Sequence, residues 1–85
     1  MNKLKLNKMN YETWRVHSDI TSKIRFTTFK KASDIEEIVL NRLKIDDIEN
    51  ELVKEYVKSF LISVDYDDIS VYINNEIMER EINKN

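Results

Sequence analysis

The side chains best placed for metal chemistry in this 85-residue sequence are the carboxylates around position 65. Asp65, Asp67 and Glu76 have the spacing of positions 1, 3 and 12 of an EF-hand calcium loop. Position 5 is however Ile69, and position 6, which is glycine in that loop, is Ser70. The sequence therefore predicts no calcium site. It favours a solvated turn after a helix, with an exposed acidic recognition patch as the alternative.

Other catalytic and metal-binding patterns are missing from the composition. His17 is the only histidine and there is no cysteine, so a metal site built from several His or Cys ligands is excluded. A lone histidine in a predicted strand is more often a surface or packing residue than a ligand. The sequence has no glycine, which excludes the glycine-dependent phosphate-binding loops. We therefore predict no catalytic residue, no metal, no cofactor and no enzyme activity.

Charge is distributed unevenly along the chain. Residues 1–31 contain eight basic and two acidic residues, a net charge of +6, whereas residues 32–85 contain six basic and fourteen acidic residues, a net charge of −8. The whole chain therefore carries −2. Such asymmetry is typical of a protein whose two halves present different surfaces to partners.

The acidic half predicts binding to another protein with a basic surface. Acidic surfaces steer association with basic partners and compete with nucleic acid for positively charged grooves. The residues that we expect in this partner-binding surface are Glu51, Glu55, Asp65, Tyr66, Asp67 and Asp68.

The basic half supports an alternative, in which the protein is a small nucleic-acid-binding regulator. Lysines and arginines contact phosphates, and exposed aromatic rings stack on bases. The overall acidity opposes this reading, because nucleic-acid-binding domains are usually basic. The residues of this alternative are Trp14, Lys23, Arg25, Lys30 and Lys31. A structural homodimer is the third reading.

The elements that would position these side chains begin with a β-hairpin predicted over residues 12–29. Trp14 and Val16 alternate with Arg15 and His17, residues 18–22 form a plausible connection, and residues 23–29 are rich in β-branched and aromatic side chains. A helix over residues 10–22 is the alternative, since Tyr11 and Trp14 are three residues apart.

Two helices are predicted in the middle of the chain. Ser33 to Glu36 has the pattern of a capping box, and residues 46–49 repeat the acidic start for a second, longer helix. The second helix has an apolar stripe at three- and four-residue spacing. Its members are Ile48, Leu52, Val53, Tyr56, Val57, Phe60 and Leu61.

A second hairpin is predicted after the helices, with strands at 69–73 and 76–82 and a two-residue turn at Asn74–Asn75. The fold class is therefore α+β: a small single domain over residues 1–85, with the order β-β-α-α-β-β and two helices packed on one face of an antiparallel sheet. Residues 1–10 are expected to form a flexible arm or an edge strand, and residues 83–85 a disordered tail. Without glycine, left-handed positions should be occupied by Asn, Asp or Ser.

Composition also suggests a source and a location. Asn, Lys and Ile occupy 30 positions, a bias typical of low-GC genomes, and no apolar run is long enough to span a membrane. We expect a cytoplasmic protein of a low-GC host cell. In size and composition the chain resembles accessory proteins of phages and mobile elements, a class that includes anti-CRISPR proteins. That resemblance involves no specific residues, and it implies inhibition of a host nucleic-acid-handling protein by occlusion.

Overall fold

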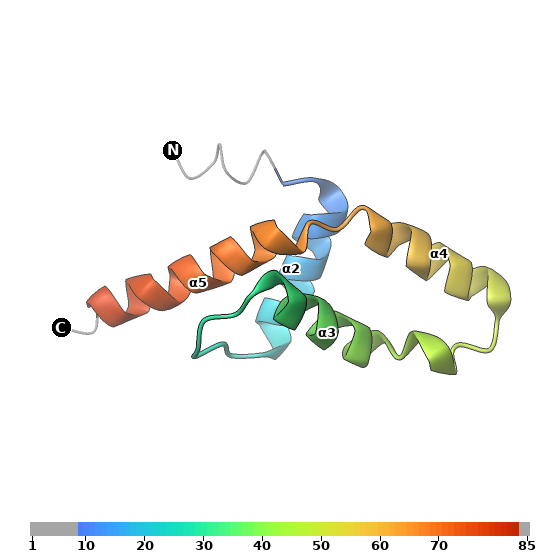
Figure 1. The fold of residues 1–85 in the computed structure, drawn as a ribbon, viewed down its shortest axis with the longest axis horizontal. Coiled ribbons are helices and arrows are strands. Elements are labelled where there is room, and N and C mark those ends of the chain that lie inside the picture. Colours follow the sequence, from blue (N-terminus) through green and yellow to red (C-terminus); the bar gives the residue numbers. More distant parts are fainter. Residues whose placement is uncertain (1–8, 84–85) are drawn as a thin grey trace.

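The computed structural model describes residues 9–83 and shows a purely helical fold. Its elements are α2 (Tyr11–Lys23), α3 (Ala32–Leu43), a 3-10 helix η1 (Ile45–Asp47), α4 (Glu51–Ile62) and α5 (Tyr66–Asn83) (Figure 1). The predicted α+β class with an antiparallel sheet is wrong, because the described residues contain no strand. The expectations for residues 1–8 and 84–85 lie outside the described residues.

The first predicted hairpin is replaced by helix α2 and an irregular connection, so the helical alternative for this segment is correct. Asn10 caps the helix, with its Oδ1 accepting a hydrogen bond from the Thr13 N–H at 2.8 Å. Thr13, Val16 and Ile20 are the buried residues of α2, and their spacing of three and four residues is the helical period. The alternation in residues 14–17 is too short to distinguish the two periods.

The second predicted hairpin is also wrong, because residues 66–83 form one continuous helix. The acidic segment 65–68 is therefore not the predicted turn that follows a helix and leads into a strand. It starts α5, where Asp65 Oδ1 accepts a hydrogen bond from the Asp68 N–H at 3.2 Å. Ile69, Ile73 and Ile77 are buried at every fourth position. Isoleucine favours strands by local preference, but here packing against neighbouring helices overrides that preference.

The two middle helices exist, but they begin at other residues than the sequence predicts. At the start of α3 the Lys31 N–H donates to Asp34 Oδ2 at 3.0 Å, in place of the predicted box from Ser33. Asn50 caps α4 through hydrogen bonds from the backbone N–H groups of Leu52 (2.9 Å) and Val53 (3.1 Å) to its Oδ1. Residues 45–47 form the separate η1 turn.

The core lies where α2 and α3 pack against α5 (Figure 1). The helices therefore cover another helix and not the face of a sheet. The residues of this core are Val16, Ile20, Phe26, Ile35, Val39, Val64, Ile69, Ile73 and Ile77.

Polar side chains of α5 fix the connection between α2 and α3. Asn74 Oδ1 accepts from the Lys30 N–H at 2.8 Å, and Asn74 Nδ2 donates to the Lys30 carbonyl at 2.9 Å. The Ser70 hydroxyl donates to the same carbonyl at 2.6 Å, and Arg80 Nη2 donates to the Phe26 carbonyl at 2.7 Å. The residues predicted as a hairpin turn at Asn74–Asn75 thus lie inside a helix, where Asn74 contacts the chain at Lys30.

A left-handed residue links α3 to η1. Lys44 has φ 50° and ψ 54°, the one positive φ among the described residues. Its N–H donates to the Leu40 carbonyl at 3.0 Å and so closes α3. The expectation that Asn, Asp or Ser would occupy such positions is wrong here.

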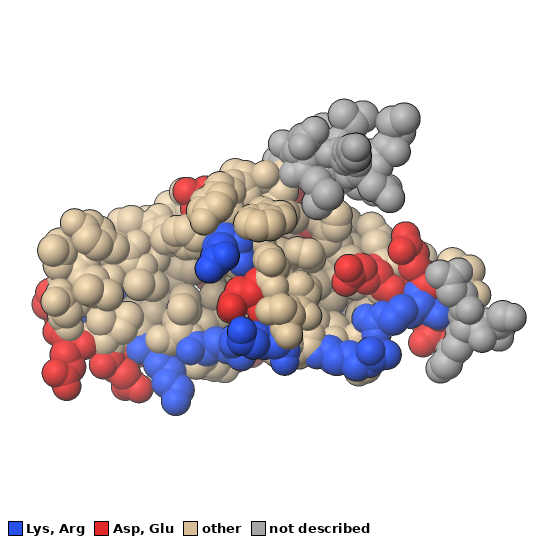
Figure 2. Space-filling view, turned by 180° about the vertical axis from the view of Figure 1, so that it is seen from behind, with Lys and Arg blue, Asp and Glu red and all other residues tan. Residues whose placement is uncertain are grey.

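The molecule is elongated, with extents of 50 × 25 × 19 Å. Its accessible surface is 6595 Å², compared with about 5,300 Å² for a compact protein of this mass. Figure 2 shows basic side chains along one long edge, while most acidic side chains on that face lie toward its ends. Among the described residues, no helix has the length and apolar character needed to cross a bilayer.

Candidate protein-binding face

Helix α4 exposes its apolar stripe. All of its residues are described, and none of them is buried. Leu52 is 60% exposed, Val53 45% and Tyr56 66%. Large apolar side chains that share one exposed helix face are a recurring feature of protein interaction sites. We call Leu52, Val53 and Tyr56 the α4 face.

Among residues 9–83, the contacts of α4 with the core come from its C-terminal half. Val57, Phe60 and Leu61 are half-buried, and the last two pack against the core. Figure 1 shows that α3 and α4 both extend away from the core and are joined at their far ends through η1. The helix is therefore held at its C-terminal end, with its N-terminal half away from the core.

Hydrogen bonds to the start of α2 anchor that C-terminal end. Asn10 Nδ2 donates to the Ser63 carbonyl at 2.7 Å. The Asp65 N–H donates to the hydroxyl of Thr13, a fully buried residue, at 2.8 Å. These bonds fix the turn between α4 and α5, and with it the direction in which α4 leaves the core.

An apolar groove lies between α2, α3 and α4. Its volume is about 460 Å³, and it is lined by Arg15, Val16, Asp19, Ile20, Val39, Arg42, Leu43, Tyr56, Val57, Phe60 and Leu61. A second, larger depression of about 770 Å³ lies between α3, η1 and α4, with Leu40, Ile45 and Ile62 among its apolar lining residues. Both cavities have α4 as a wall, so the separation of α3 from α4 creates concave surface beside the α4 face.

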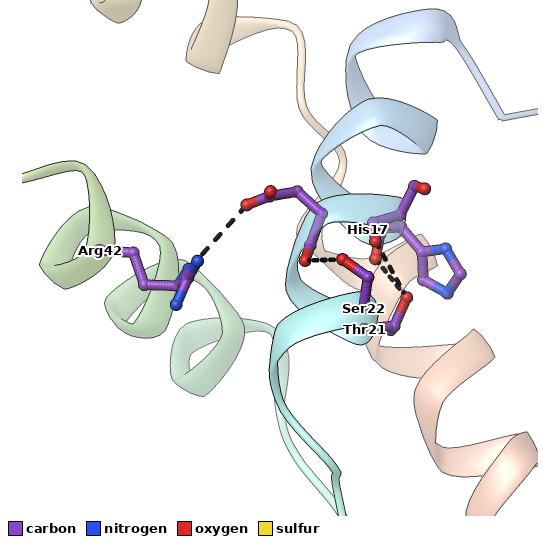
Figure 3. A network of polar contacts seen from close by, with 6 residues as sticks. His17, Thr21, Ser22 and Arg42 are labelled. Carbon is purple, nitrogen blue, oxygen red and sulfur yellow. Dashed lines mark hydrogen bonds and ion pairs between the residues drawn. The ribbon is translucent and has the colours of Figure 1, made fainter.

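Charged side chains border the smaller groove. Arg42 Nε lies 3.9 Å from Asp19 Oδ2, an ion pair that links α3 to α2. Figure 3 shows Arg42 directed at α2, while the imidazole of His17 lies on another side of that helix. Both partners are substantially exposed, and such a pair contributes little to stability.

The predicted acidic surface is not a single patch in the structure. Glu51 and Glu55 are exposed on the polar face of α4, beside Leu52. Glu51 begins α4 whereas Asp65 follows its end, so the length of the helix, about 18 Å, separates them. Asp65 caps α5, and Asp67 and Asp68 lie in its first turn, where negative charge interacts favourably with the helix dipole.

The first turn of α5 has two shifted ionisable groups. Partial burial raises the pKa of Asp68, and the charges of Asp65 and Asp67 raise it further. Tyr66, also predicted in the acidic surface, packs against the core, and burial raises the pKa of its phenol, with a smaller contribution from Glu36. A structural role at the helix start accounts for these residues without a ligand.

The residues of the nucleic-acid alternative separate into two groups. Trp14, Lys23 and Arg25 are exposed, and the Trp14 ring lies 6.2 Å from that of Tyr11. Lys30 and Lys31 have backbone roles, since Lys30 bonds to Asn74 and the Lys31 N–H to Asp34. Sequence reasoning missed Arg42 and Arg80, which belong to the acidic half of the chain but lie near Asp19 and Phe26 in the structure.

His17 packs between α2 and α5. Its ring lies 5.6 Å from the ring of Tyr72. Burial lowers the pKa of His17, although the nearby Glu76 carboxylate opposes that shift. Its Nε2 and the Tyr72 hydroxyl are buried atoms without a hydrogen-bond partner among the described residues. A neutral packing histidine fits this environment.

Within residues 9–83, no group of three or more His, Asp or Glu side chains is arranged to hold a metal ion. No protein-family model, no curated protein and no solved structure matches the chain. The candidate site therefore depends on the α4 face and its grooves alone. The sequence showed the apolar stripe of α4, but the exposure of that stripe has no local sequence signal.

Proposed function

We propose that this protein is a non-enzymatic module that binds another protein through the α4 face. The observation that carries the proposal is the exposure of Leu52, Val53 and Tyr56 on a helix with no buried residue. An apolar stripe on a helix of a small domain is normally covered, because leaving it in water forfeits the hydrophobic stabilisation. A partner protein would supply that cover.

The surroundings of the α4 face fit the anatomy of a protein interface. Interfaces have an apolar, often aromatic core surrounded by a polar rim. Tyr56 is an aromatic residue of the kind that dominates binding energies, and Glu51 and Glu55 lie beside Leu52 as acidic rim residues. We expect a partner with an apolar ridge bordered by basic side chains, consistent with the basic partner that the charge distribution predicts.

We propose occlusion as the mode of action. A small domain that covers part of its target needs no catalytic group. This mode agrees with the implied likeness to small inhibitory proteins of phages and mobile elements. The lack of cysteine fits action in a reducing cytoplasm, and the Asn, Lys and Ile bias fits a low-GC host cell.

The test is affinity capture of the tagged protein from nuclease-treated lysate of its own host cells. The wild type should retain a stoichiometric protein partner, and the double variant Leu52→Asp/Tyr56→Glu should lose it. Asp at the second position of α4 and Glu inside the helix are compatible with helix formation, so the free energy of unfolding should change little. Val71→Glu is the matched control, since Val71 is 55% exposed on α5.

Two results would contradict the proposal: capture of no protein by the wild type, or unchanged capture by the double variant. A further variant separates the apolar face from the predicted acidic surface. Reversing Glu51, Glu55, Asp65, Asp67 and Asp68 to lysine should weaken capture only partly if the carboxylates form a rim. Complete loss with this variant, together with full retention by the double variant, would assign binding to the acidic residues instead.

A further inference from the structure

Five exposed basic side chains from four segments line two depressions of the surface, and Tyr56 of the α4 face contributes to the wall of one of them. The five basic side chains are Arg15 and Lys23 on α2, Arg25 in the connection, Arg42 on α3 and Arg80 on α5, which we call the basic edge. Lys23, Arg25 and Arg80 line one depression of about 360 Å³, and Arg15 and Arg42 line the apolar groove between α2, α3 and α4. Figure 2 shows Lys and Arg side chains following a long edge of the molecule.

The backbone beneath the basic edge is fixed. Arg80 donates to the Phe26 carbonyl at 2.7 Å, which brings the end of α5 to the connection. The connection is held again at Lys30 by Asn74, so Arg25 projects from a segment attached to α5 at two points. A charged surface assembled before binding loses less conformational entropy when a ligand arrives.

The local charge of this edge is opposite to that of the whole chain. The side chains that line the two cavities include two carboxylates, Asp19 and Glu76, beside the five cations, a local charge of +3. Asp19 is paired with Arg42, and Glu76 lies close enough to His17 to affect its pKa. The field near this edge is therefore positive although the protein carries −2 overall.

The chemistry of the edge favours phosphates over carboxylates of a protein partner. Four of the five cations are arginines, whose planar guanidinium forms paired hydrogen bonds with phosphate. The hydroxyl-bearing residues Thr21 and Ser22 also line the 360 Å³ depression. The 360 Å³ depression is lined mainly by polar and charged residues, unlike the apolar centre of a typical protein interface.

The spacing along α2 suits a nucleic-acid strand. Arg15 and Lys23 are eight residues apart on one helix, a rise of about 12 Å. One strand of a duplex carries a phosphate about every 3.4 Å of axis, so about three to four phosphates lie within that distance. We infer that the basic edge binds the phosphate backbone of double-stranded nucleic acid without reading its sequence.

The experiment measures fluorescence anisotropy of labelled duplexes of about 20 base pairs, one DNA and one RNA, over a salt series from about 50 mM upward. We expect binding to at least one duplex at the lowest salt, with log K against log salt falling at a slope of about −3 to −4. The variant Arg15→Gln/Lys23→Gln/Arg25→Gln should bind at least about tenfold more weakly, with a slope flatter by about 2 to 3. It spares Arg42 and Arg80, whose structural contacts would otherwise be lost.

The matched control is Lys44→Gln/Lys54→Gln/Lys58→Gln, which removes the same charge outside the basic edge and should bind nearly as the wild type does. Circular dichroism and thermal unfolding check that each variant is folded. The inference is overturned by absence of duplex binding at low salt, by equal losses in the two triple variants, or by equally tight binding of poly-glutamate. The single variant Leu52→Asp, at a residue that lines neither depression, should retain duplex binding while it weakens capture of the protein partner, so the two proposals succeed or fail independently.

Discussion

Helices α4 and α5 both have large apolar side chains at three- and four-residue spacing, with opposite outcomes. In α5, Ile69, Ile73 and Ile77 are buried between α2 and α3. In α4, Leu52, Val53 and Tyr56 remain exposed, whereas Phe60 and Leu61 near the C-terminal end of the helix pack against the core. The two helices follow each other in the chain, separated by three residues.

The difference shows that amphipathic periodicity gives a helix an apolar face but does not determine whether another element packs on that face. Helices α2 and α3 pack on α5, and the connection between them is attached to Ser70, Asn74 and Arg80 of α5. No comparable attachment joins the N-terminal half of α4 to the described part of the chain. Substitutions in α5 should therefore change stability, whereas substitutions in the α4 face should change binding.

The largest expected effect is that of a cavity in the core. Ile73→Ala, at a side chain 1% exposed, should lower the free energy of unfolding by about 3 kcal/mol, because a buried aliphatic group is lost and its space cannot be refilled. Leu52→Ala is the paired change in α4 and should cost less than about 0.5 kcal/mol. Urea unfolding measures both changes in the free energy of unfolding. Similar losses in the two variants would contradict the difference in burial between the two helices.

A smaller effect is expected from the contact between α5 and Lys30. Asn74→Ala should cost about 1–3 kcal/mol, since the Lys30 N–H and carbonyl both lose a partner in a partly buried place. Asn75→Ala is the neighbouring control, at an exposed position of the same helix, and should stay within about 0.5 kcal/mol of the wild type. Equal costs would show that Asn74 does not hold the connection.

The α2–α5 contact should make stability depend on pH. Burial lowers the pKa of His17, so the folded protein binds this proton less tightly than the unfolded chain. The free energy of unfolding should therefore decrease as pH falls below about 6.5, until the folded form also takes up the proton. Urea midpoints between about pH 5 and 7 test this, and His17→Gln should flatten the profile. An unchanged slope in that variant would assign the dependence to other groups.

The smallest expected effect is at the left-handed link that leads from α3 toward α4. Lys44→Gly should raise the free energy of unfolding by about 0.5–1 kcal/mol, because glycine adopts positive φ without the steric cost that lysine bears. Thermal unfolding measures the gain. Binding through the α4 face should not change, because the substitution relieves backbone strain and adds no cover to α4. A loss of stability would show that the lysine side chain contributes more than the strain costs.

Sequence reasoning located α3 and α4 because both have acidic starts and apolar residues at helical spacing. It misread α2 and α5 for a shared reason. Short runs such as residues 14–17 and 69–73 satisfy a strand pattern locally, and β-branched side chains strengthen that reading. The buried spacing of Thr13, Val16 and Ile20 becomes visible only over a longer window. Asp65 looked like the end of one helix but caps the next, since the same side chain suits both positions.

The sequence by itself determined the charge asymmetry, the lack of cysteine and glycine, and the helical stripes of the middle of the chain, because these depend on residue identity and short spacing. Tertiary structure alone decided which stripe is covered and which cations come together. Burial and electrostatic proximity depend on contacts between distant residues, such as Arg80 with Phe26 and Asn74 with Lys30. Those contacts hold α2 and its connection against α5, while α4 keeps its apolar face in solvent.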